Sequence, residues 1–82
     1  MPRNRTPEHL AFGQSLRRLR AERGWSQEQL GYQAKLHRNY IGGVERGDLN
    51  PTLTSIFKLA RAFETKPSKL LALTEEELAA RS

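Results

Sequence analysis

Two adjacent side chains, Arg38 and Asn39, have the chemistry to read the edges of DNA bases. An arginine guanidinium can bond O6 and N7 of guanine together, and an asparagine amide can bond N6 and N7 of adenine in the same way. Both residues stand near the start of a predicted short helix, where a recognition helix places its base-reading side chains. Taken alone, the pair has a simpler interpretation as two ordinary exposed polar residues.

The helix that carries this pair is predicted to begin near His37 and to end at Gly47. At about 100° per residue, with Ile41 taken as the inward reference, the helix has two distinct sides. The inward side carries His37, Tyr40, Ile41 and Val44, with Tyr40 at its edge. The outward side carries Asn39, Gly42, Gly43 and Arg46, with Arg38 at its flank. The outward side is therefore free to enter a major groove.

Two glycines, Gly42 and Gly43, lie in the middle of this predicted helix. Together they cost roughly 1 to 2 kcal/mol relative to alanine, so we expect another interaction to offset the cost. One possibility is close approach of the helix backbone to DNA. The other is close packing against a neighbouring helix.

Local signals place another short helix directly before this one and a longer helix before that. Ser26 with Gln29 three residues later is a capping box, which predicts a helix start, and Leu30 with Ala34 forms its apolar side. The earlier helix has Thr6 as its cap, Pro7 at its first position and Glu8 in its first turn, and Gly24 ends it. Its apolar stripe is formed by Phe12, Leu16 and Leu19. The segment 26–47 thus predicts two short helices joined by a tight turn.

The remainder of the chain is also predicted to be helical. Thr52 is the expected cap of a fourth, strongly amphipathic helix, whose apolar positions are Leu53, Ile56, Phe57, Ala60 and Phe63. A proline-started helical turn is expected over residues 67–71. Thr74 with Glu77 is another capping box, which predicts a separate short C-terminal helix. No segment alternates with a period of two, so we expect an all-α fold, a compact bundle of about five short helices.

The charge of the chain is distributed unevenly along its 82 residues, which are enough for one domain. Residues 1–46 hold nine Lys and Arg against four Glu, whereas residues 47–82 hold five charges of each sign. The whole net charge of +5 therefore lies in the first half. A basic half beside a neutral half favours a polyanion as partner, although a basic surface that only contacts water is an equal alternative on charge alone.

Several function classes find no support in the composition. The chain has no cysteine, which excludes disulfides, thiolate metal sites and cysteine nucleophiles. Its two histidines, His9 and His37, are separated by a helix and a turn, and there is no phosphate-binding glycine loop or spaced ligand cluster. We therefore expect no enzyme, metal, cofactor or small-molecule substrate. No apolar run is long enough for a membrane span or a secretory signal, so we expect a cytoplasmic, nucleoid-associated protein without membrane contact.

An ordered set of short motifs over residues 12–71 resembles the helix-turn-helix domain of the Xre, or phage Cro/repressor-like, transcriptional regulators. The matching segments are Leu-Arg-Arg-Leu-Arg at 16–20, Ser-Gln-Glu-Gln-Leu at 26–30, Tyr-Ile at 40–41, Val-Glu-Arg-Gly at 44–47, Asn-Pro-Thr-Leu at 50–53 and Leu-Ala at 59–60. The chain is most similar to the small controller proteins of restriction-modification systems. The resemblance implies a lambda-repressor-like DNA-binding fold and a sequence-specific transcriptional regulator of double-stranded DNA.

The resemblance also implies roles for individual residues. The positions matching base-reading residues are Arg38, Asn39 and His37, and those matching or flanking phosphate-binding residues are Gln27, Arg46, Asn50 and Arg17. Gln27 has the alternative of being an exposed first-turn residue. Arg20 and Glu45 match a structural pair that ties the first helix to the third. Two positions depart from the family pattern: Lys35 replaces a turn glycine and is expected in the left-handed region at a cost of about 1 kcal/mol, and His37 replaces a better helix cap.

The resemblance further implies a homodimer on a palindromic operator, and we divide the chain accordingly. Residues 1–5 are expected to be a flexible N-terminal arm, residues 6–73 the DNA-binding domain, and residues 74–82 a short C-terminal helix or tail. The expected dimer surface is the exposed edge of the fourth helix with Leu70, Leu71 and Leu73. The alternative is a protein-binding adaptor or antitoxin-like module, in which residues 70–78 contact a different protein.

Overall fold

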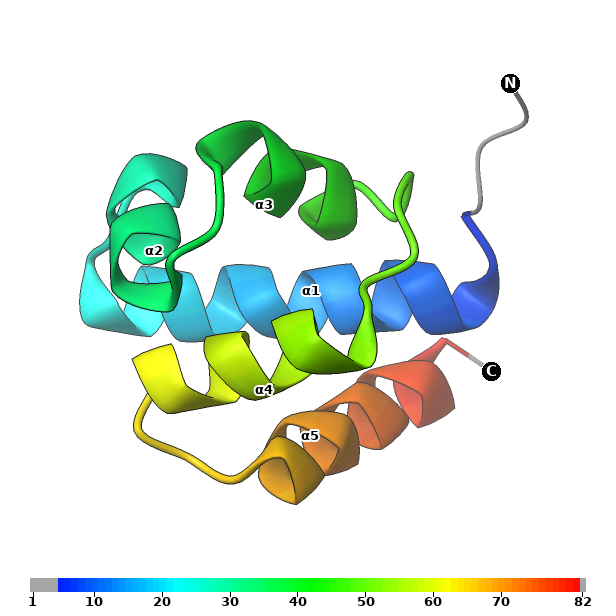
Figure 1. The fold of residues 1–82 in the computed structure, drawn as a ribbon. Coiled ribbons are helices and arrows are strands. Elements are labelled where there is room, and N and C mark those ends of the chain that lie inside the picture. The colour runs from blue at the N-terminus through cyan, green and yellow to red at the C-terminus, as the bar shows by residue number, and fades with distance from the viewer. Residues whose placement is uncertain (1–4, 82) are drawn as a thin grey trace.

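The computed structural model describes residues 5–81, which form five α-helices and no strand (Figure 1). The helices are α1 (Pro7–Arg23), α2 (Gln27–Ala34), α3 (Arg38–Glu45), α4 (Leu53–Ala62) and α5 (Pro67–Ala80). The prediction of an all-α bundle of about five helices is confirmed. None of the helices formed by residues 5–81 is long and apolar enough to cross a membrane.

The predicted ends of α1 are confirmed by their hydrogen bonds. The Thr6 hydroxyl accepts the His9 amide at 3.1 Å, and Pro7 is the first helical residue. Gly24 follows the last turn in the left-handed region, at φ 66°, where glycine has no steric penalty. These local contacts fix the length of the helix on which the rest of the bundle packs.

Local hydrogen bonds and one left-handed residue set the two ends of α2 and the start of α3. Ser26 and Gln29 make both hydrogen bonds of the predicted capping box, at 3.0 and 2.7 Å, so α2 starts where expected. Lys35 ends α2 with φ 57° and ψ 43°, which confirms the left-handed conformation expected there. His37 then caps α3, because its Nδ1 accepts the Asn39 amide at 3.0 Å.

The prediction of a separate C-terminal helix starting at Thr74 is wrong. Residues 74–80 are the second half of α5, and the Thr74 hydroxyl donates to the Leu70 carbonyl at 3.0 Å instead of capping a new helix. Ala72 and Leu73 are good helix formers with no glycine or proline to interrupt them, so the helix continues. The domain boundary expected after residue 73 therefore falls inside a helix. Arg18 and Glu77, 2.6 Å apart, join this half of α5 to α1.

The N-terminal arm was predicted over residues 1–5, of which 1–4 lie outside the described residues. Arg5 is not part of a free arm. Its amide donates to the Gly47 carbonyl at 2.6 Å, and its guanidinium pairs with Asp48 in the loop between α3 and α4. Residue 5 is therefore held against that loop.

The core lies among the five helices: α1 packs against α3 and α5, α2 packs against α3 and α4, and α4 packs against α5 (Figure 1). One large apolar residue from each helix is completely buried there: Leu16, Leu30, Ile41, Leu59 and Leu70. In α4, Ala60 is buried and Ile56 partly so, but Leu53 and Phe57 are 71% and 46% exposed. The apolar side of α4 is therefore wider than the core that it contacts.

Candidate DNA-binding surface

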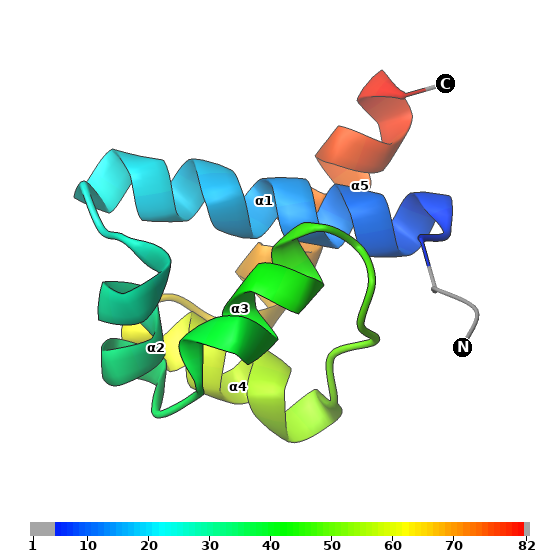
Figure 2. The ribbon, with the colours of Figure 1, turned by 90° about the horizontal axis from the view of Figure 1, so that it is seen from above.

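The helix α3 lies on the outer side of the bundle, as the view from above shows (Figure 2). Within this helix Ile41 and Val44 are buried, whereas Arg38 and Asn39 are exposed. The helical periodicity placed these four residues correctly. It was wrong for His37, which was expected on the inward side but is exposed, because it lies before the helix as its N-cap in an extended conformation. The first turn of α3 thus presents a guanidinium and an amide to solvent, together with the exposed His37 that caps it.

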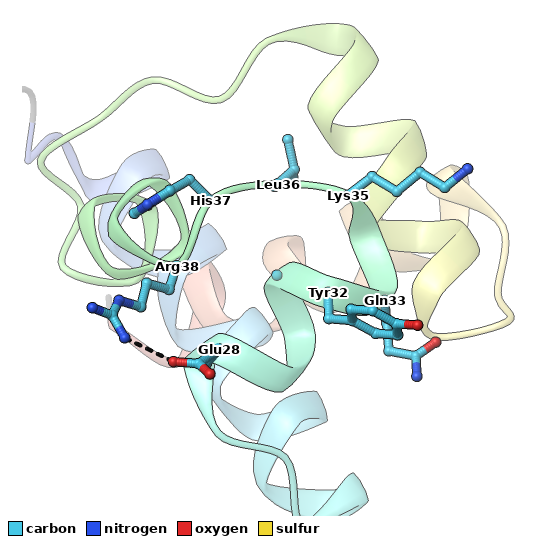
Figure 3. A pocket seen from close by; sticks show the side chains of 8 residues that line it. Glu28, Tyr32, Gln33, Lys35, Leu36, His37 and Arg38 are labelled. Carbon is cyan, nitrogen blue, oxygen red and sulfur yellow. Dashed lines mark hydrogen bonds and ion pairs between the residues drawn. The ribbon is translucent and has the colours of Figure 1, made fainter.

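The Arg38 guanidinium is paired with a carboxylate from the neighbouring helix. Arg38 Nη1 lies 2.7 Å from Glu28 Oε2, although the two residues are ten positions apart in the sequence. Figure 3 shows this pair at the edge of a pocket that continues along Tyr32, Lys35 and the turn between the helices. The pair joins the first turn of α2 to the first turn of α3.

A second carboxylate, Glu45 at the end of α3, ties three helices together. Its side chain has no exposed surface, and it accepts hydrogen bonds from Arg20 Nε at 2.7 Å and Arg20 Nη2 at 3.0 Å. Gln27 Nε2 donates to the same carboxylate at 3.0 Å. The structure thus joins Arg20 of α1 to Glu45 as the sequence resemblance implied, and adds Gln27 of α2.

This arrangement keeps Arg20 charged. The hydrogen bond to Glu45 raises the pKa of Arg20 above its ordinary value, and desolvation opposes that rise more weakly. The stability from a raised arginine pKa is fully present below the ordinary value and is lost only as pH rises through the raised one. The pair therefore gives no pH dependence from its arginine side near neutrality.

Three of the four predicted phosphate-binding residues lie around the N-terminus of α2 and the C-terminus of α3. Arg17 Nε is 3.7 Å from Glu45, which Gln27 also contacts, and Arg46 is exposed and bonded through Nε to Asp48 at 3.0 Å. A Cβ on Gly42 would lie 3.2 Å from the Arg46 guanidinium and 3.3 Å from the Gln27 amide oxygen, so these two side chains meet over Gly42. This group combines two cations with an amide at a positive helix end, which suits a phosphate.

Asn50 is the predicted phosphate-binding residue that does not join this group. It lines an apolar pocket of about 300 Å³ together with His9, Ile56 and Leu71, between α1, α4 and α5. The family resemblance had grouped Asn50 with Gln27, Arg46 and Arg17 as phosphate-binding candidates. The loop between α3 and α4 instead carries Asn50 to this apolar pocket.

The prediction that Gly42 and Gly43 form an outward surface is wrong, since both are buried. The loop after α3 folds back: the amides of Asp48 and Leu49 both donate to the Gly43 carbonyl. A Cβ on Gly43 would lie 2.5 Å from Leu49 Cδ1. Of the two explanations for the glycines, packing is the one found, although the packing partners are a loop and two side chains instead of a helix.

Sequence reasoning missed Gly13, which sets the distance between α1 and α3. A Cβ at this position would lie 2.4 Å from the Glu45 carbonyl oxygen and 2.6 Å from that of Val44. These are backbone atoms, which cannot move aside as a side chain can. The available signal was a glycine in the middle of a predicted amphipathic helix, where it costs stability unless a neighbour needs the space.

Three acidic residues near the α2 and α3 contacts described above pair with arginine. Glu28 pairs with Arg38, Glu45 with Arg20, and Asp48 with both Arg46 and Arg5. Sequence reasoning did not identify Glu28 or Asp48 as partners. Among residues 5–81, no group of three His, Asp or Glu could hold a metal ion.

Comparisons with known proteins find a matching family model and several similar proteins. A family model described as helix-turn-helix matches residues 16–70. The control protein C.BamHI of Bacillus amyloliquefaciens is 41% identical over 66 residues, which cover 79% of this chain and 82% of that protein. The crystal structure of the restriction-modification controller protein C.AhdI from Aeromonas hydrophila has 46% identity and a TM-score of 0.77, over 79% of this chain and 98% of that one. The controller protein C.Esp1396I, crystallised as a tetramer with its natural 35 base-pair operator, has 26% identity and a TM-score of 0.79, over 88% of this chain and 95% of that one.

Proposed function

The chain belongs to the helix-turn-helix family, and from that premise we propose that it is a DNA-binding transcriptional regulator of the restriction-modification controller type. The observation that carries the proposal is the first turn of α3, where Arg38 and Asn39 are both exposed. A relative of the same fold is known in complex with its operator.

In this proposal the first turn of α3 enters the major groove and reads bases. Arg38 bonds O6 and N7 of a guanine, and Asn39 bonds N6 and N7 of an adenine. His37 has its Nδ1 committed to the Asn39 amide, which leaves only Nε2 for a base or phosphate. Arg38 and Asn39 therefore carry most of the discrimination.

The phosphate contacts come from the group around Gly42. Gln27 has an amide proton left after its bond to Glu45, and it lies at the N-terminal turn of α2, whose dipole favours an anion. Arg46 and Arg17 add positive charge on either side. Such contacts fix the register on the duplex but carry no sequence information.

We further propose that the protein acts as a homodimer on a palindromic site. Leu53 and Phe57 are one helical turn apart on α4, and Leu71 on α5 is 44% exposed. Leu70, expected in this surface from the sequence, is buried and cannot contribute, and the expected Leu73 is partly buried in a different pocket with Arg18 and Lys69. The proposal requires a two-fold axis through this apolar surface that sets two copies of α3 about 34 Å apart, which is one helical turn of DNA.

The protein-binding adaptor is the second candidate, because the same apolar surface could bind a different protein. Sedimentation separates the two. A dimer is expected for the regulator, whereas a monomer whose weak DNA affinity disappears at moderate salt would favour the adaptor.

Selection of bound duplexes from a random library tests the proposal. We expect enrichment of one palindrome with a guanine and an adenine in each half-site. Recovery of unrelated sequences, with no motif above the starting library, would contradict it.

A further inference from the structure

We infer that Glu28 is a positioning residue for base reading, because its carboxylate directs the Arg38 guanidinium from the neighbouring helix. The inference rests on the proposed function, in which Arg38 reads a guanine. It assigns part of the sequence specificity to α2, outside the recognition helix.

The geometry leaves Arg38 able to read a base while it is held. A guanidinium has five N–H donors, and the bond from Arg38 Nη1 to Glu28 Oε2, at 2.7 Å, uses one of them. The others remain available for the two acceptors of a guanine. Figure 3 shows the two side chains meeting between the first turns of α2 and α3, beyond the turn that carries Lys35, Leu36 and His37.

The pair contributes little to the stability of the free protein. The Arg38 and Glu28 side chains are 61% and 73% exposed, and ion pairs at such exposure are weak in water. Such a pair has its main effect when another group competes with Glu28 for Arg38, and that effect is on binding and not on folding. On DNA the competitors for Arg38 are the phosphates, which surround the groove and are the same in every sequence.

Glu28 opposes that competition in two ways. Its negative charge repels a phosphate that approaches Arg38, and its hydrogen bond restricts a side chain that otherwise rotates about four bonds. Both effects act against non-specific contacts and leave the guanine contact in place. The other acids on this side are held elsewhere, Glu45 by Arg20 and Asp48 by Arg46 and Arg5.

A double-mutant cycle on the specificity ratio tests the inference. The dissociation constants of wild type, Glu28→Ala, Arg38→Ala and the double variant are measured for the selected operator and for a scrambled duplex of equal length, at one salt concentration. Glu8→Ala is the matched control, because Glu8 is also an exposed acid at the second position of its helix and has no part in the proposed contacts. Glu28 is exposed and alanine favours helix, so the variants are expected to fold.

We expect Glu28→Ala to bind the scrambled duplex more tightly and to lower the ratio of specific to non-specific affinity about 3- to 10-fold. Glu8→Ala should keep the ratio, and Glu28→Ala should have no effect on the ratio once Arg38 is absent. An unchanged ratio in Glu28→Ala overturns the inference alone. A loss of equal size in the Arg38→Ala background, or in Glu8→Ala, also overturns it, since Glu28 would then contact a base itself or act only through net charge. A wild-type ratio of one overturns the proposed function as well.

Discussion

Arg20 of α1 and Glu45 of α3 form a two-point ion pair inside the protein, with hydrogen bonds of 2.7 and 3.0 Å to a carboxylate that has no exposed surface. The same carboxylate accepts Gln27 of α2. The orientation of α3 relative to the rest of the bundle is therefore fixed before DNA is bound. A fixed helix avoids part of the ordering cost of binding.

Removal of Arg20 is expected to destabilise the fold strongly. Arg20→Ala leaves a buried carboxylate with fewer partners, and we expect a loss of about 2 to 4 kcal/mol in the free energy of unfolding. Urea denaturation followed by Trp25 fluorescence measures it. Arg18→Ala is the control, because Arg18 also pairs with a glutamate but is exposed, and it should change stability little. Equal effects of the two substitutions would show that the buried pair is not important for folding.

Alanine at two of the glycines should have opposite effects on stability. Gly13→Ala places a methyl group against the backbone of α3, so we expect a loss of at least about 2 kcal/mol. Gly42→Ala meets only the ends of Gln27 and Arg46, and the gain of about 1 kcal/mol in helix propensity should outweigh that contact.

Gly42→Ala should still weaken DNA binding, because it moves the two proposed phosphate contacts. Thermal unfolding and binding to a scrambled duplex, measured on the same samples, check this prediction. Destabilisation by Gly42→Ala as large as that by Gly13→Ala would contradict it.

Relief of the left-handed backbone at the turn should stabilise the protein. Lys35 has φ 57°, so Lys35→Gly removes a steric penalty, partly offset by the greater freedom of glycine in the unfolded chain. We expect a net gain of about 0.5 to 1 kcal/mol in urea denaturation. Gln33→Gly, at an exposed position inside α2, should instead cost about 1 kcal/mol. A loss of stability in Lys35→Gly would mean that its side chain makes a contact worth more than the strain.

A charge on the apolar surface of α4 should separate the proposed dimer. Phe57 is 46% exposed, and Phe57→Glu would bury a carboxylate at a two-fold interface twice. Sedimentation equilibrium should give a dimer for wild type and a monomer for Phe57→Glu. Tyr32 is also an exposed aromatic residue but lies on α2, so Tyr32→Glu should remain dimeric. A wild-type monomer, or a dimer that survives Phe57→Glu, would exclude this surface.

The fold was predictable where its signals are local. Thr6, Ser26 and Thr52 cap helices through hydrogen bonds to residues three positions later, so the chain itself encodes those starts. The same signal failed at Thr74. A capping pattern starts a new helix only where the preceding residues have ended theirs. Here the packing of α5 along α1 keeps that helix continuous through Thr74.

The site was predictable only in part for a related reason. Periodicity placed Arg38 and Asn39 outward because both lie on one helix. It could not show that Leu49 folds back over Gly43, or that Glu28 reaches Arg38 from another helix. Those contacts depend on the path of a loop and on the angle between two helices, which no spacing in the sequence specifies.

The most direct measurement of the central claim replaces single guanines of the selected operator by 7-deazaguanine, which lacks the N7 acceptor. For wild type, we expect one guanine in each half-site at which the replacement weakens binding by about 1 to 3 kcal/mol. Arg38→Ala should be insensitive at that position, whereas Arg61→Ala, at an exposed arginine of α4, should behave as wild type. If Arg38→Ala lost as much affinity as wild type at every guanine, Arg38 would not read the operator and the assignment of α3 would be contradicted.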